Sequence, residues 1–365
     1  MKRYYCIAGF ILVTLGSGVS QYTFTNEPAA NCTAVEDQQS TNTCWSFATT
    51  SFIESELIRA TKPAVDLSEM YIVRQIYLDK ARNYLLRQGK ANFAEGGLSH
   101  DVIHAISTYG AMPESAYPGR AFDQERLDHH ELIVVLKSVL DGMLNKKAVS
   151  DKWPEVVNAI LDVYLGPLPE TFQVGNKTYT ARSFARDLNL ELADYVSITS
   201  FTHHPFYETF VLEIPDNHAN GSYYNVPIAD LERITKNALA NGHTIAWDGD
   251  VSEHGFGAQH GIAVLPGTSR EDFFMQPGPE MDVTQEDRQK AFELFATTDD
   301  HLMHITGTAQ DRQGNNYLIV KNSWGEIGPY NGFLYMSPAY FKAKTIAIMV
   351  HLDAIPADIA ARMAL

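Results

Sequence analysis

The stretch Asp37–Ala48, DQQSTNTCWSFA, changes character at its cysteine. Polar, turn-forming residues precede Cys44, and apolar residues at helical spacing follow it. We therefore expect a helix that begins at or near Cys44, with free backbone N–H groups and the positive end of the helix dipole beside the thiol. That position favours an anion, so the pattern predicts a thiol with a lowered pKa and a nucleophilic thiolate.

Gln38 lies on the polar side of the same stretch, six residues before Cys44. A side-chain amide at that reach can donate a hydrogen bond to an oxyanion that forms beside the sulfur. The alternative is a buried structural cysteine, which is what most unpaired cysteines are. From this stretch alone, both interpretations stay open.

The spacing Gln38-x5-Cys44-Trp45-x-Phe47 resembles the nucleophile segment of papain-like cysteine peptidases. The resemblance implies that Gln38 belongs to the oxyanion hole and that Cys44 is the nucleophile. Thr41 stands where better-known members have a second cysteine. The bleomycin hydrolase and aminopeptidase C branch also lacks that cysteine, so the departure points to this branch.

Towards the C-terminus, two predicted strands bring a histidine near an asparagine. A neutral histidine can take a thiol proton and return it to a leaving amine, and an asparagine can orient the ring. Asn322–Gly325 reads Asn-Ser-Trp-Gly, the most specific motif in the chain, and by resemblance Asn322 is the orienting residue and Trp324 shields the pair. We favour His304 as the base over His301, whose register three residues earlier fits the predicted strand less well.

Gly96 and Gly97 form a pair without side chains, which lets a ligand approach the backbone closely. A plain turn is the alternative. By resemblance, Gly96 and Gly97 match a segment whose backbone pairs with the substrate peptide, and we place them with Trp324 as substrate-binding residues.

The resemblance covers nearly all of residues 35–356 and implies an α+β, papain-like two-lobe fold. One lobe is helical and built on the Cys44 helix, and the other is a β-barrel-like sheet that carries the histidine and Asn322. We expect one peptidase domain over residues 21–365, with a helical insertion at about 119–222, where the branch also carries one.

The N-terminus reads as a signal peptide over residues 1–20. Lys2 and Arg3 are followed by the apolar run Tyr4–Leu15, which is short for a membrane span, and by small residues that suit cleavage before Gln21. A retained membrane anchor is the alternative. We expect an exported protein, periplasmic or secreted, whose Cys32 stays free if Cys44 is the nucleophile.

The formal net charge of the 365-residue chain is −16, and no basic cluster is present in the sequence. This argues against nucleic acid and anionic membrane surfaces as partners. The pairs His129-His130 and His203-His204 lack a second pair at zinc-like spacing, so we expect neither a metal nor another cofactor.

These patterns favour a cysteine peptidase that acts on peptide substrates through a Cys44 acyl-thioester, of bleomycin hydrolase-like aminopeptidase type. In that branch a C-terminal arm enters the cleft, and members form hexamers; residues 357–365 make a shorter tail, and a homo-oligomer is an open expectation. An endopeptidase with an open cleft and a non-catalytic peptide-binding protein remain alternatives.

Overall fold

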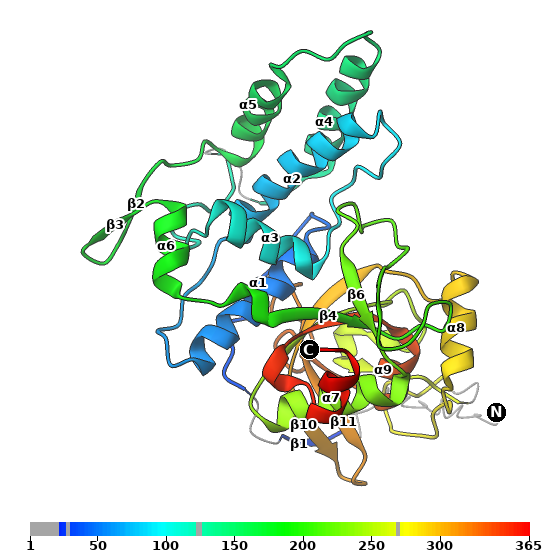
Figure 1. The fold of residues 1–365 in the computed structure, drawn as a ribbon. Coiled ribbons are helices and arrows are strands. Elements are labelled where there is room, and N and C mark those ends of the chain that lie inside the picture. The colour runs from blue at the N-terminus through cyan, green and yellow to red at the C-terminus, as the bar shows by residue number, and fades with distance from the viewer. Residues whose placement is uncertain (1–21, 27–29, 122–125, 268–270) are drawn as a thin grey trace, which may run out of the picture.

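The computed structural model describes residues 22–26, 30–121, 126–267 and 271–365. It has two lobes, a helical one and one built on a large sheet, which meet along the first long helix (Figure 1). This arrangement confirms the predicted α+β papain-like class. The expected signal peptide at residues 1–20 lies outside the described residues.

The helical lobe is centred on α1, Cys44–Arg59, which begins at the predicted cysteine. The helices α2, Glu69–Leu86, and α3, Ser99–Tyr109, pack against it. The α2 helix begins where the sequence predicts, because the Ser68 side chain accepts a hydrogen bond from the Tyr71 backbone N–H. Burial of the apolar faces of these helices forms one hydrophobic core.

The expected insertion is helical only in its first part. It contains α4, His130–Leu144, and α5, Trp153–Leu165, which lie at the end of the helical lobe farthest from the sheet (Figure 1). The hairpin of β2, Phe172–Val174, and β3, Lys177–Tyr179, then leads into α6, Ala181–Leu188.

After α6 the chain returns to the sheet lobe rather than staying helical. The strand β4, Tyr195–Thr199, pairs with β13, and β5, Thr209–Val211, and β6, Ser222–Asn225, extend the sheet beyond it. The predicted helical character of residues 119–222 is therefore wrong for its last third. The reason is that β4 does not alternate: Ser197, Ile198 and Thr199 are all buried. A short strand that is buried on both faces cannot be told from a buried helix segment by periodicity alone.

Among the described residues, eleven strands form one mixed sheet in the order β5-β6-β4-β13-β7-β10-β11-β12-β9-β8, with β1 paired to β10. The remaining strands are β1 Phe24–Asn26, β7 Ile245–Gly249, β8 Phe256–Gly257, β9 Ile262–Ala263, β10 His301–Asp311, β11 Asn316–Lys321, β12 Phe333–Met336 and β13 Thr345–His351. The central strands β7, β10 and β13 are almost wholly buried.

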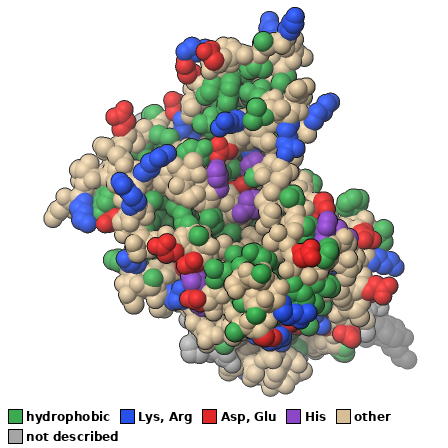
Figure 2. All heavy atoms as spheres, in the orientation of Figure 1, with side chains coloured by type: hydrophobic (Ala, Val, Ile, Leu, Met, Phe, Trp, Pro, Cys, Tyr) green, Lys and Arg blue, Asp and Glu red, His purple; other side chains and the backbone are tan. Residues whose placement is uncertain are grey.

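Four further helices accompany the sheet: α7 Ile228–Ala240, α8 Gln285–Glu293, α9 Pro338–Lys344 and α10 Ala357–Arg362. Apolar residues of α7, α9 and α10 share a second core with β7 and β10. Within the described residues, no helix combines the length and apolar character needed to cross a bilayer. Figure 2 shows Lys and Arg side chains dispersed among acidic ones on the face drawn.

Candidate active site

A pocket of about 560 Å³ lies between the two lobes and collects most of the predicted site residues. The helical lobe contributes Cys44 from the start of α1, together with the loop segment of Gly96 and Gly97. The sheet lobe contributes His301 from the start of β10, and Trp324 from the loop after β11. The expected cleft between lobes is therefore present, with both halves of the predicted chemistry on its walls.

Cys44 is the first residue of α1, as predicted, and its side chain is 7% exposed. Its electrostatics differ from the prediction. Burial raises the pKa of the Cys44 thiol to about 12; a backbone hydrogen bond from Leu302 acts in the opposite direction, and nearby aspartates, Asp299 first among them, raise the pKa further. The thiol is thus protonated in the free protein, because desolvation and acidic neighbours outweigh the helix N-terminus.

An imidazole–amide pair is present, as expected, but His301 forms it with Asn322 in place of His304. Asn322 Oδ1 accepts from the Ser323 backbone N–H (2.8 Å), which fixes it as an acceptor, so His301 Nε2–H is the donor across the 2.7 Å to Asn322. This tautomer leaves His301 Nδ1 unprotonated. Burial lowers the pKa of His301 to about 4, and the Trp324 ring lies 4.6 Å from the imidazole, centroid to centroid.

The prediction of His304 as the base is wrong. His304 is fully buried, and its Nδ1 lies 2.9 Å from Ser51 Oγ on α1, away from the pocket. Strand parity explains the error, because His304 stands opposite Lys321 in the β10–β11 register, one residue before Asn322. Neighbouring residues of a strand face opposite sides, so Asn322 shares its side with His301, three residues from His304.

Gln38 lines the pocket as predicted and is held firmly in place. Its Oε1 accepts from Ser323 Oγ (2.7 Å), and its Nε2 donates to the Thr41 carbonyl (2.6 Å). Its backbone N–H also donates to the Ser323 carbonyl (2.9 Å). An amide nitrogen carries two protons, so one remains for a ligand beside Cys44.

Gly96 and Gly97 also line the pocket, and both positions require the absence of a side chain. A Cβ at Gly97 would come within 2.8 Å of the Trp45 ring, and one at Gly96 within 1.8 Å of an Asp216 carboxylate oxygen. Lys80 Nζ donates to the Gly96 carbonyl and holds this edge of the pocket. The two glycines therefore let the Trp45 ring and the Asp216 carboxylate pack closely against the backbone at the edge of the pocket. That this backbone binds a substrate stays a prediction.

Comparison with known proteins agrees with this geometry. The model of the Peptidase C1-like family matches residues 16–364. The chain belongs to this family. It is therefore a cysteine-type peptidase, and the predicted papain-like membership is confirmed.

Named relatives lie at modest identity. Aminopeptidase C of Listeria monocytogenes is 24% identical over 91% of this chain and 82% of its own length. Aminopeptidase G of Lactobacillus delbrueckii subsp. lactis is 23% identical over 70% and 63%, and bleomycin hydrolase of Gallus gallus is 24% identical over 74% and 65%. The chain thus spans 63% to 82% of these relatives' own lengths.

Among solved structures, PepW from Lactobacillus rhamnosis matches with a TM-score of 0.74 at 19% identity. The match covers 94% of this Peptidase C1-like chain and 85% of PepW. At this identity the likeness speaks for the fold, which both proteins share.

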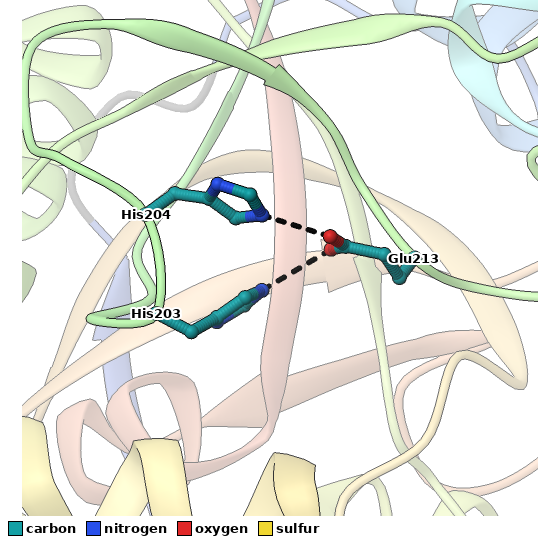
Figure 3. Close-up of side chains that lie close together, drawn as sticks. All are labelled: His203, His204 and Glu213. Carbon is teal, nitrogen blue, oxygen red and sulfur yellow. Dashed lines mark hydrogen bonds and ion pairs between the residues drawn. The ribbon is translucent and has the colours of Figure 1, made fainter.

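His203 and His204 meet a third potential metal ligand that the sequence did not pair with them. Both Nε2 atoms point at the Glu213 carboxylate, at 3.1 and 2.8 Å (Figure 3). Gln289 Oε1 accepts from the Thr202 backbone N–H, so its Nε2 is the donor to His203 Nδ1 (3.0 Å). That donor leaves the ring proton on His203 Nε2, and hydrogen bonding to Glu213 accounts for the cluster.

Sequence reasoning missed the acidic side of the pocket. Asp216, Asp299 and Asp300 line it alongside Cys44 and His301. Asp299 and Asp300 directly precede His301, and strand β10 begins at the histidine itself. The sequence signal that could have identified both the base and the acids is the position of Asp299-Asp300-His301 at the very start of the predicted strand. Residues at that end of β10 line the pocket.

Proposed function

We propose that this chain is an aminopeptidase of the Peptidase C1-like family, which removes residues from the free amino end of peptides. The observation that carries the proposal is the convergence of Cys44, His301 and Gln38 on one pocket, with Asn322 hydrogen-bonded to the histidine. The names of the relatives, which include aminopeptidases C, G and W, supply the choice of reaction.

In the proposed reaction, Cys44 Sγ attacks the carbonyl carbon of the peptide bond while His301 Nδ1 takes the thiol proton. The oxyanion accepts hydrogen bonds from Gln38 Nε2 and from the Cys44 backbone N–H at the start of α1. The His301 proton then moves to the leaving amine, which departs. A water, deprotonated by His301, hydrolyses the thioester and restores the thiol.

The protonation states make His301 a base from the outset. The pKa of about 12 at Cys44 and of about 4 at His301 leave both groups neutral at pH 7. Proton transfer therefore accompanies attack on the substrate, and Asn322 keeps Nδ1 turned to the thiol through its bond to Nε2–H.

A second candidate, an endopeptidase with an open cleft, is favoured by the placement of α10. Arg362 lies 3.9 Å from Asp230, and Asp358 pairs with Arg233 on α7 (2.9 Å). No described residue from 352 to 365 lines the pocket. Residues 352–365 are therefore not the source of the amino-end specificity proposed for this chain.

Fluorogenic aminoacyl amides and their N-acetylated counterparts separate the candidates. The aminopeptidase proposal expects hydrolysis of the free-amino substrate and loss of hydrolysis on acetylation. Equal cleavage of both would support the endopeptidase instead. Absence of hydrolysis together with absence of Cys44 labelling by a thiol-directed inhibitor would support the non-catalytic alternative.

We also propose export and homo-oligomerisation. Export rests on the Lys2-Arg3 start and the apolar run Tyr4–Leu15, and the intact mass of the protein secreted by an expression host tests cleavage before Gln21. Oligomerisation rests on the resembled branch, and sedimentation velocity of the purified chain tests it, with a monomer at all concentrations as the contrary result.

A further inference from the structure

A buried and a partly buried carboxyl group lie together at one side of the active-site pocket. Asp248, on β7, is 3% exposed, and Asp299 lines the pocket just before β10. The two side chains lie within hydrogen-bonding contact of each other. None of the described residues donates a hydrogen bond to either oxygen of Asp248 or to Asp299 Oδ2.

Two carboxylates in contact repel each other unless a proton or a cation lies between them. Burial and the charge of Asp299 hold the pKa of Asp248 well above its usual range, and burial and Asp216 raise the pKa of Asp299 to about 7. The pair therefore retains a proton in the free protein, in a position where a bound cation would replace it.

The positive charge of Lys80 acts to lower the pKa of Asp216 and Asp299, but its hydrogen bonds go elsewhere. Lys80 Nζ donates to the carbonyls of Ala94 and Gly96. No ion pair within the described residues joins Lys80 to Asp248, Asp299 or Asp216. Asp216 and Asp299 line the pocket, and Asp248 contacts Asp299 from behind without lining the pocket itself. We call these three residues the acidic wall, which offers carboxyl oxygens to whatever occupies the pocket.

We propose that the acidic wall is a subsite for an organic cation of the substrate: its α-ammonium group, or the ammonium or guanidinium of a basic side chain next to the scissile bond. Both offer several N–H donors to the two oxygens of Asp248 and to Asp299 Oδ2, which accept no hydrogen bond from the described residues. The inference rests on the proposed peptidase function, because the same pocket contains Cys44 and His301.

The spacing of the acids fits an organic cation better than a metal ion. Within the described residues, only His203, His204 and Glu213 bring three potential ligand atoms within 4.8 Å of one another. The three aspartates are more widely spaced than that. A metal with oxygen ligands at its short bond lengths needs a closer set, whereas a substrate cation with spread N–H groups does not.

The test uses the full chain and matched substrate pairs that differ only in charge. One pair is a free-amino and an N-acetyl aminoacyl coumarin amide. The other is an N-acetyl dipeptidyl coumarin amide with arginine, or with its neutral isostere citrulline, second from the scissile bond. The two pairs distinguish the α-ammonium from a basic side chain as the bound cation.

We expect the parent protein to prefer the charged member of at least one pair by about 10-fold or more in kcat/KM. This is the size of effect expected when a hydrogen bond to a charged group is gained. The double substitution Asp248→Asn with Asp299→Asn is expected to reduce that preference to about 3-fold or less. Hydrolysis of the neutral member should change less than hydrolysis of the charged member. Alkylation of Cys44 by iodoacetamide should become faster, because loss of the Asp299 and Asp248 charges lowers the pKa of the thiol. Asp282→Asn, which removes one carboxylate at an exposed site, is the control for an Asp-to-Asn change away from the pocket.

The inference is overturned if the parent shows no preference in either pair, or if the double variant keeps the parent's preference while still folded by circular dichroism. Its failure is distinguishable from failure of the aminopeptidase proposal. A parent that cleaves N-acetyl substrates freely refutes the aminopeptidase, yet the arginine–citrulline pair still tests the wall. If the parent cleaves only free-amino substrates and the double variant keeps the parent's preference for the charged member, only the acidic-wall inference is refuted.

Discussion

The two histidines of β10 show how three residues separate a pocket group from a structural one. His301 opens the strand, contacts Asn322 and Trp324 and lines the pocket. His304 lies behind it, fully buried, with Ser51 Oγ between its Nδ1 and Lys321 Nζ. Burial and the Lys321 charge hold the pKa of His304 well below its usual range. Both rings are neutral, but only His301 has an unprotonated nitrogen that a substrate can use.

The largest effect on activity is expected from His301→Ala, which tests whether His301 and not His304 is the base. Loss of the general base should lower kcat/KM for an aminoacyl coumarin amide by roughly 10²- to 10⁴-fold. The measurement is steady-state hydrolysis, with thermal unfolding as a check on the fold. Activity close to that of the parent would show that another residue acts as the general base.

The second prediction concerns Cys44 and its alkylation by neutral iodoacetamide. Because its raised pKa of about 12 lies above the assay range, the thiolate fraction and the alkylation rate should rise about tenfold per pH unit between about pH 6 and pH 9. Peptide mass spectrometry separates Cys44 from Cys32. A rate that is already level at neutral pH would reveal a preformed thiolate–imidazolium pair instead.

Asn322→Ala tests the difference between the two histidines further, because it removes a hydrogen-bond partner of His301 that His304 does not share. We expect kcat to fall roughly 10- to 100-fold, as misoriented catalytic groups do, with a smaller change in KM. The variant Asn322→Gln keeps an amide but moves it, and should recover little. A change in KM alone would assign Asn322 to substrate binding rather than to orientation of the ring.

The smallest effect on activity is expected from His304→Leu. The substitution leaves Ser51 without its acceptor inside the protein, so it should cost about 1–3 kcal/mol in the free energy of unfolding. Because His304 lies outside the pocket, kcat/KM should stay within about threefold of the parent. A loss comparable to that of His301→Ala would contradict the assignment of roles.

Much of the fold and half of the site follow from local signals in the sequence. The polar-to-apolar switch at Cys44 gives the start of α1, and the Ser68 cap gives the start of α2. Gln38 and Asn322 come from their motifs; Gln38 lines the pocket, and Asn322 is hydrogen-bonded to His301 beside it. Such features depend on a few neighbouring residues, which is why they are predictable.

The base and the acidic wall depend on information that is not local. The choice between His301 and His304 requires the register of β10 against β11, and a slip of one residue reverses every face. The meeting of Asp248 and Asp299 requires the pairing of β7 with β10. The thiol pKa depends on burial and distant aspartates, which outweigh the helix end that the sequence reveals.

The packing of α1 directly on β10 has a consequence for the order of events in folding. The nucleophile begins the first long helix, while its partner begins a strand that the ribosome supplies only near the end of synthesis. A chain still emerging, or one with its lobes undocked, holds a thiol and an imidazole that have not met. Hydrolytic competence should therefore appear last in refolding, after helical signal and compaction.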